Sequence, residues 1–202
     1  MSDPGKIARL AIALAEVKPP VRRCIEVPLD IRLDRLHRVF QIVMGWEDCH
    51  LYEFRIGRSI AYGVPDSDWD FPGSSPRPAN KATLADLLAQ TRNKTFQYVY
   101  DFGDDWRHTG KLEALAQAEP NTIYPRLLSA QGRCPPEDVG GPWGYAEYLK
   151  AMADPRHERH ADMVEWRGPD FDPTAVDEAS IQKQLSRLGP RPRRKPKTAA
   201  SP

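Results

Sequence analysis

The segment TFQYVYDFGDDWRH, residues 95–108, constrains the fold of this chain more than any other stretch. Every second side chain in its first half is aromatic, a spacing that is typical of a half-buried β-strand with its aromatic face on the core. The residues predicted to face the core are Phe96, Tyr98, Tyr100 and Phe102. Turn-forming residues follow at 103–105, so we expect residues 106–112 to return as the second strand of a hairpin.

Upstream of this hairpin we expect strands around one long helix. Residues 7–17 fit either a helix or a strand, and residues 21–27 are rich in β-forming side chains. Apolar side chains recur at helical spacing over residues 32–44, and Gly45 is a suitable end for that helix. The remaining strands predicted here are residues 51–56 and 58–62.

Proline-rich loops and further helices are expected in the rest of the chain. Residues 63–80 hold four prolines and little periodicity, so they are predicted as a long loop, after which Thr83 caps a short helix. A second irregular stretch is expected from Tyr124 onward. The predicted C-terminal helices are residues 143–153, residues 157–166 and a helix that begins at Asp172 and runs to about Leu188.

These elements predict an α+β fold with a mixed or mostly antiparallel sheet of five or six strands. The opening order of two strands, a helix and two strands (β-β-α-β-β) is compatible with a β-grasp-like start. The C-terminal helices are expected to pack on the same core. We expect residues 1–188 to form a single domain and residues 189–202 to be a disordered basic tail.

The net charge of +1 hides an uneven distribution, because residues 183–202 hold seven Lys or Arg and no acid. The remainder of the chain is therefore acidic and a poor electrostatic partner for nucleic acid. DNA binding is considered for the tail only, as opposed to a role as a solubilising end or as a partner for the acidic body. The candidate phosphate contacts are Arg191, Arg193, Arg194, Lys195 and Lys197.

Cysteine usage and hydropathy indicate in which cellular compartment the protein is expected. The three cysteines show no CxxC pairing, which fits a reducing cytoplasm better than a disulfide framework. No apolar run approaches the roughly 20 residues that a membrane-spanning helix needs. We therefore expect a cytoplasmic protein without a membrane partner.

Four segments carry a resemblance to a known family: GWEDCHLYEF (45–54), YGVPDSDWDF (62–71), YDFGDDWRH (100–108) and CPPEDVGGPWGYAEYLKAMADPRHERH (134–160). Together they resemble the plasmid pRiA4b ORF-3-like family over about residues 6–182. The resemblance implies no chemistry, although some members are labelled as insertion-element passenger proteins with a resolvase-like (TnpR-like) name. Where the family has a Trp followed by two Arg after paired prolines, this chain has Arg22, Arg23 and Cys24. The basic tail lies outside the resemblance.

An acidic corner at the hairpin turn is a candidate metal site. Asp101, Asp104 and Asp105 supply the oxygen ligands that Mg²⁺ or Ca²⁺ prefers, and His50 or His108 are potential further ligands. The alternative is that the aspartates accept backbone N–H groups to shape the turn, while Arg107 neutralises a neighbour.

A candidate binding pocket follows from the motifs. We predict that GWEDCH, YDFGDDWRH and CPPEDVGGPW meet on one face in a pocket walled by Trp46, Trp106 and Trp143, as opposed to three tryptophans packed in separate parts of the core. Cys134 is either a nucleophile or metal ligand, or an inert packed thiol. The candidate pocket residues are Trp46, His50, Asp101, Asp104, Asp105, Trp106, His108, Cys134, Glu137, Asp138 and Trp143.

Two functional hypotheses follow. The chain contains no GxxxxGK[ST], HExxH or GxSxG motif, so no catalytic residues are assigned. The first hypothesis is a non-catalytic binding or adaptor module, associated with plasmids or mobile elements, for an unknown protein or small-molecule ligand. The alternative is a metal-dependent hydrolase, or a nuclease or recombination-related enzyme, at the acidic corner. A divalent metal is the only cofactor considered.

Overall fold

The computed structural model describes residues 5–65 and 75–189 of the chain. The strands are β1 (Lys6–Leu14), β2 (Arg22–Pro28), β3 (Tyr52–Ile56), β4 (Ile60–Gly63), β5 (Arg77–Pro78), β6 (Thr95–Tyr100), β7 (Trp106–Gln117) and β8 (Arg126–Gln131). The helices are α1 (Leu33–Met44), α2 (Leu84–Ala89), α3 (Gly141–Ala153), α4 (His160–Arg167) and α5 (Glu178–Leu188), with a 3-10 turn at Ala79–Lys81.

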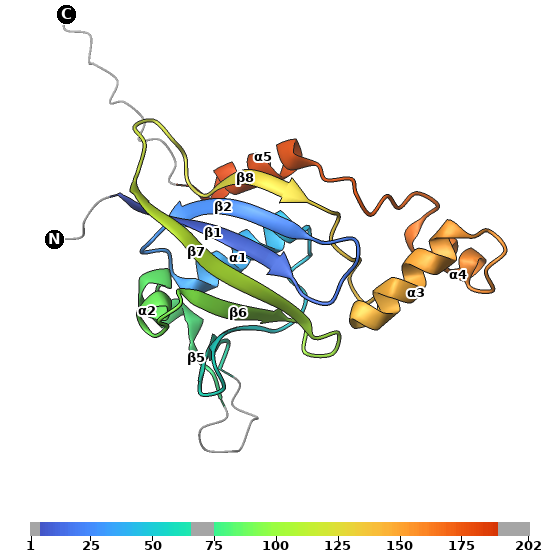
Figure 1. The fold of residues 1–202 in the computed structure, drawn as a ribbon, viewed down its shortest axis with the longest axis horizontal. Coiled ribbons are helices and arrows are strands. Elements are labelled where there is room, and N and C mark those ends of the chain that lie inside the picture. The colour runs from blue at the N-terminus through green and yellow to red at the C-terminus, as the bar shows by residue number, and fades with distance from the viewer. Residues whose placement is uncertain (1–4, 66–74, 190–202) are drawn as a thin grey trace, which may run out of the picture.

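A single sheet of eight strands organises the described residues, in the order β5-β4-β3-β6-β7-β1-β2-β8 (Figure 1). Neighbouring strands are antiparallel except β4 and β5, which are parallel. The mixed sheet and its helices confirm the expected α+β fold, but the sheet has eight strands where five or six were expected. The β-grasp-like start is not confirmed, since β6 and β7 lie between the β1–β2 pair and the β3–β4 pair.

The central hairpin has the predicted strands, with Tyr98 opposite His108 and Tyr100 opposite Trp106. Phe96, Tyr98 and Tyr100 are buried as predicted. The prediction for Phe102 was wrong, because its side chain is 42% exposed. Strand β6 ends at Tyr100, and Asp101 adopts a left-handed conformation with φ of 56°. This residue breaks the alternation, so the following side chain no longer points to the core.

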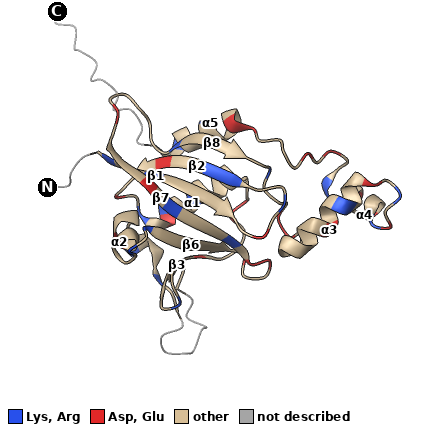
Figure 2. Cartoon of the chain, viewed as in Figure 1, with Lys and Arg blue, Asp and Glu red and all other residues tan. Residues whose placement is uncertain are grey.

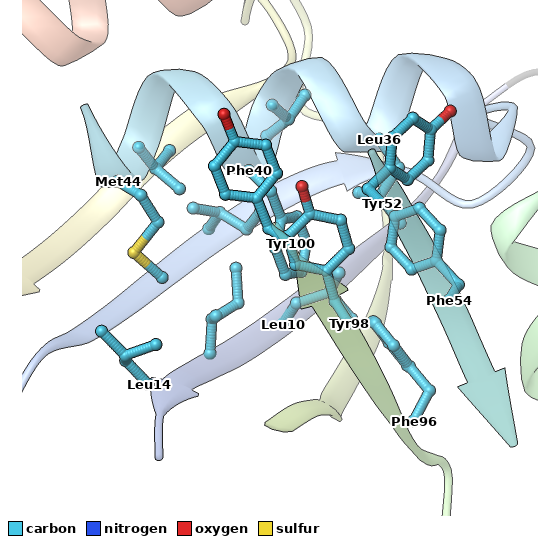
Figure 3. Close-up of a cluster of buried hydrophobic side chains, with 14 of the residues drawn as sticks. Leu10, Leu14, Leu36, Phe40, Met44, Tyr52, Phe54, Phe96, Tyr98 and Tyr100 are labelled. Carbon is cyan, nitrogen blue, oxygen red and sulfur yellow. The ribbon is translucent and has the colours of Figure 1, made fainter. Parts of the chain in front are cut away.

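Helix α1 crosses one face of the sheet and packs on the aromatic side chains of β3 and β6 (Figure 3). The Phe40 ring lies 5.8 Å from Phe54 in an edge-on contact and 4.6 Å from Tyr98, measured between ring centroids. Aromatic pairs in such tilted arrangements contribute stability beyond their buried area. The helix ends at Gly45 as predicted, and this residue adopts a left-handed conformation with φ of 87°.

Two of the differences from the sequence prediction lie in the C-terminal half of the chain. Residues 126–131, predicted as irregular, form strand β8 on the outer edge of the sheet beside β2. Helix α5 begins at Glu178 rather than Asp172, and Asp177 caps it by accepting the N–H of Ser180. Asp172 instead accepts hydrogen bonds from the backbone and hydroxyl of Thr174, forming a local turn before the helix.

The C-terminal helices cover different parts of the core. Helix α5 lies over β8 and against α1, with Ile181 and Leu185 buried. Its side chains also bind the strand, since Gln182 accepts the N–H of Leu127 and Glu178 accepts the N–H of Ala130. Figure 1 shows α3 and α4 beyond one end of the sheet. Helix α3 joins the core through Tyr145 and Tyr148, which are part of the same buried cluster as α1.

Charged residues of both signs are interspersed over the described elements (Figure 2). On the strands, Arg9 pairs with Glu26 at 2.9 Å, and Arg126 pairs with the other oxygen of Glu26 at 2.6 Å. The five basic residues proposed as phosphate contacts, at positions 191–197, lie outside the described residues. Within residues 5–65 and 75–189, no helix is both long and apolar enough to cross a membrane.

Gly110 provides a test of the β6–β7 register, because the ring of Phe96 packs on its Cα. A Cβ at position 110 would lie 2.4 Å from Cζ of Phe96, so we expect Gly110→Ala to destabilise the fold by about 1–3 kcal/mol in urea unfolding. The control is the same substitution in a Phe96→Ala background, where the ring is absent and the added cost is expected to be under about 0.5 kcal/mol. An equal cost in both backgrounds would contradict this packing.

Candidate functional site

Three loops that are distant in sequence meet at one end of the sheet. They are residues 45–51 between α1 and β3, residues 101–105 between β6 and β7, and residues 134–140 before α3. Hydrogen bonds and ion pairs connect each loop to the other two. These loops contain three of the motif segments that the sequence singles out.

The buried carboxylate of Glu137 joins these loops. Its Oε1 atom accepts the backbone N–H of Glu47 at 2.9 Å and the hydroxyl of Tyr100 at 3.0 Å. The Tyr100 hydroxyl in turn accepts the backbone N–H of Cys49 at 3.2 Å. Burial raises the pKa of Tyr100, so its hydroxyl stays protonated and donates to the carboxylate. The second carboxylate oxygen, Oε2, is buried without a hydrogen-bond partner among the described residues.

His50 connects the same three loops from the solvent side. Its Nε2 atom lies 3.0 Å from Oδ1 of Asp138 and 3.5 Å from Oδ2 of Asp101. The imidazole is partly exposed, while Asp101 is buried and Asp138 is open to solvent. Its ring also meets the ring of Tyr100 edge-on. One histidine therefore faces two carboxylates that come from different loops.

The backbone at this junction is held in left-handed conformations. Each loop places an aspartate there, with φ of 60° at Asp48, 56° at Asp101 and 58° at Asp138. Non-glycine residues occupy this region at some cost, and such residues cluster at functional sites. Gly141, with φ of 68°, lets the start of α3 approach the hairpin turn, since a Cβ there would lie 2.6 Å from the carbonyl oxygen of Asp104.

The three aspartates of the hairpin turn, which are candidate metal ligands from the sequence, have separate partners in the structure. Asp101 accepts backbone N–H groups of its own turn through Oδ1. Asp104 accepts the N–H of Gly140 through Oδ2 at 3.1 Å. Asp105 pairs with Arg107. The carboxylates are thus engaged in shaping the turn and docking the next loop, as the alternative interpretation holds, and only Asp101 also approaches His50.

The tryptophans do not form the walls of one pocket. Trp46 and Trp106 are buried with ring centroids 6.2 Å apart, and Trp46 stacks on Tyr100. Trp46 also donates its indole N–H to the carbonyl of Pro135, which fixes the segment before α3. Trp143 is 75% exposed. The expected pocket walled by three tryptophans is therefore corrected to a core pair and one exposed ring.

Two further candidates, His108 and Cys134, belong to the interior. His108 is buried, its Nδ1 lies 3.1 Å from the carbonyl oxygen of Tyr98, and burial lowers its pKa to about 4. Burial likewise raises the pKa of the Cys134 thiol, which keeps the sulfur protonated and unreactive. Both side chains are therefore held uncharged by burial.

A cleft of about 590 Å³ lies beside the junction. Its lining comes from the end of α1, residues 133–137, residues 167–171 and the start of α5. Three arginines that the sequence reasoning did not select contribute to it, namely Arg23, Arg133 and Arg167. Arg23 had one sequence signal, because it lies where the chain departs from the family pattern. The other two resemble ordinary surface residues in the sequence.

The chain belongs to the family described as "Plasmid pRiA4b ORF-3-like protein", which it matches over residues 6–180. It is 46% identical over 185 residues to the "Uncharacterized protein y4hQ" of Sinorhizobium fredii (strain NBRC 101917 / NGR234), covering 91% of this chain and 93% of that protein. A solved structure similar to it is the crystal structure of the protein of unknown function MM3350 from Methanosarcina mazei Go1. That similarity has a TM-score of 0.76 and 33% identity, and covers 87% of this chain and 97% of that chain.

The Tyr100 hydroxyl offers a test of how strongly the loops depend on Glu137. Tyr100→Phe removes the group between the Cys49 N–H and the carboxylate, so we expect a loss of about 1–3 kcal/mol in urea unfolding. Tyr52→Phe is the matched control on the neighbouring strand, expected to change stability by less than about 0.5 kcal/mol. Similar losses for both variants would contradict the special role of Tyr100.

Because His108 is buried and its pKa is lowered, we expect the stability of the fold to depend on pH. Its pKa of about 4 in the folded protein lies below the ordinary value of 6.5, so the unfolded chain binds more protons between these values. The stabilisation by neutral His108 is therefore complete above about pH 6.5 and falls by about 3 kcal/mol as the pH drops to about 4. We expect His108→Gln, whose amide does not titrate, to unfold in urea with a flatter pH profile over this range. Identical slopes would contradict a buried neutral imidazole.

Proposed function

We propose that this member of the plasmid pRiA4b ORF-3-like family is a non-catalytic binding or adaptor module associated with plasmids or mobile elements. The family description, which names a plasmid reading frame, supports the association. The observation that supports the binding role is the cleft of about 590 Å³ beside the three-loop junction. Its volume falls within the range of small-ligand sites.

The arginines of the cleft favour an anionic group on the ligand. Among the described residues, Arg133 and Arg167 line the cleft and make no ion pair. Arg133 lies over the ring of Phe171 at 4.6 Å, and Arg167 donates to the backbone carbonyl of Glu137. Both guanidinium groups are thus positioned by neutral partners. Guanidinium groups bind carboxylate and phosphate through paired, charge-assisted hydrogen bonds.

The rest of the lining favours an apolar group next to that anion. Apolar side chains of the cleft include Met44, Phe171 and Ile181. Two of the acidic residues in the lining are already engaged, since Glu137 accepts two hydrogen bonds and Asp177 caps α5. We therefore infer a ligand, either a small molecule or an exposed protein segment, that presents a carboxylate or phosphate beside an apolar group.

The residues of the cleft favour binding over catalysis. The thiol that lines it, Cys134, stays protonated because burial raises its pKa. No histidine lines the cleft within the described part of the chain, so the thiol lacks a neighbouring imidazole base. The cleft thus offers charge and shape for recognition, without an activated nucleophile.

Phenyl phosphate is a suitable probe, because it joins an anion to an apolar ring. We expect isothermal titration calorimetry of the full chain to detect phenyl phosphate but not benzyl alcohol, its uncharged analogue. Arg133→Gln and Arg167→Gln are each expected to weaken binding by about tenfold or more, given about 1.5–3 kcal/mol for a hydrogen bond to a charged group.

Arg156→Gln is the matched control, because its side chain is 93% exposed and lies outside the cleft. It is expected to bind phenyl phosphate as the unsubstituted protein does. Equal binding by all variants, or equal binding of phenyl phosphate and benzyl alcohol, would refute the cleft as an anion-directed site.

A further inference from the structure

The three-loop junction gathers side chains of the kinds that bind transition metals. Cys49, His50 and Glu137 each offer a donor atom, and the three donors lie within 4.8 Å of one another. A sulfur, an imidazole nitrogen and a carboxylate oxygen are the ligands that Zn²⁺ takes in proteins. Mg²⁺ and Ca²⁺ prefer oxygen ligands alone, so this set selects against them.

A second observation at the same place concerns the buried carboxylate of Glu137. Glu137 is only 5% exposed, and its Oε1 atom already accepts two hydrogen bonds. Its Oε2 atom is buried and has no hydrogen-bond partner among the described residues. A buried polar atom without a partner is costly and calls for an explanation such as an unseen ion. A cation bound to Oε2 would remove this cost.

The environment of His50 supports the same interpretation. Its Nε2 atom faces Asp138 at 3.0 Å and Asp101 at 3.5 Å. Metal-binding histidines usually donate their second ring N–H to a carboxylate, which fixes the tautomer and the ring orientation. With Nε2 engaged in this way, Nδ1 is the ring nitrogen available to a metal.

We propose that Cys49, His50 and Glu137 bind a divalent transition metal of the Zn²⁺ class through Sγ, Nδ1 and Oε2, with Asp138 and Asp101 orienting the imidazole. The donors of a four-coordinate zinc lie about 3.5 Å apart, so the three side chains move toward one another as the ion binds. The Cys49 thiol releases its proton to solvent as the sulfur binds the metal. Cys49 is exposed, so the ion reaches the site from solvent.

Three protein ligands leave the fourth position of the metal for water or for an incoming ligand. The metal would also tie residues 45–51 to residues 134–140, two segments that border the cleft. The proposal is independent of the anion site, because it rests on Oε2 of Glu137 and on two residues outside the cleft lining.

Cobalt titration of the full chain tests this site. Protein freed of metal with a chelator is titrated with Co²⁺ and followed by absorbance, and Zn²⁺ is then added. We expect thiolate-to-cobalt charge-transfer absorption together with the visible bands of tetrahedral Co²⁺, and loss of both when Zn²⁺ displaces it. Saturation without charge-transfer absorption would overturn the assignment, since it would exclude the Cys49 sulfur as a ligand.

Two ligand variants and one control locate the ion. Cys49→Ser and Glu137→Gln are expected to weaken Co²⁺ binding by about 100-fold or more, and Glu137→Gln keeps an oxygen for the Glu47 and Tyr100 hydrogen bonds. Cys24→Ser, which removes a different thiol on β2, is expected to bind as the unsubstituted protein does. Circular dichroism shows whether each variant is folded.

The orienting role of Asp138 predicts a smaller effect. Asp138→Asn is expected to weaken Co²⁺ binding by about 10-fold while the charge-transfer absorption persists. Binding that survives in Cys49→Ser and Glu137→Gln but is lost in Asp101→Asn and Asp138→Asn would refute the proposal, because the ion would then lie among His50 and the two aspartates.

Discussion

The hydrogen bond between the Tyr100 hydroxyl and the buried carboxylate of Glu137 connects the loops at the three-loop end of this protein. It joins the end of the central hairpin to the segment that leads into α3, and the same oxygen binds the exit of α1 at Glu47. Because these segments carry few apolar side chains of their own, polar contacts must position them. This contact therefore connects the exit of α1, the end of β6 and the segment before α3.

The parts of the fold that follow a simple period were predictable from sequence. The aromatic strand β6 and helix α1 were predicted because their alternate or helical spacing reflects one buried face each. The exposure of Phe102 was not predicted. It results from the left-handed backbone conformation of Asp101, which the alternation of side chains does not indicate. Strand β8 was missed because its pairing partner is distant β2 and its side chains show no regular burial.

The location of the candidate site was more predictable than the roles of its residues. Loops rich in Trp, Asp, Gly and Pro pointed to the junction, and they do meet there. Which side chain faces which depends on backbone conformations such as that of Asp138, which turns its carboxylate to His50. The positions of Arg133 and Arg167 in the cleft could not be predicted from sequence. A basic residue in a loop or helix is usually exposed, and its neighbours are known only from the structure.

The contacts between α5 and β8 cover one edge of the sheet. An outermost strand exposes backbone groups that can recruit a strand from another molecule. Here Gln182 and Glu178 of α5 accept the N–H groups of Leu127 and Ala130, so donors on that outer border are already used within the chain. The helix thereby acts as a shield against intermolecular strand addition, and its loss would open this border to aggregation.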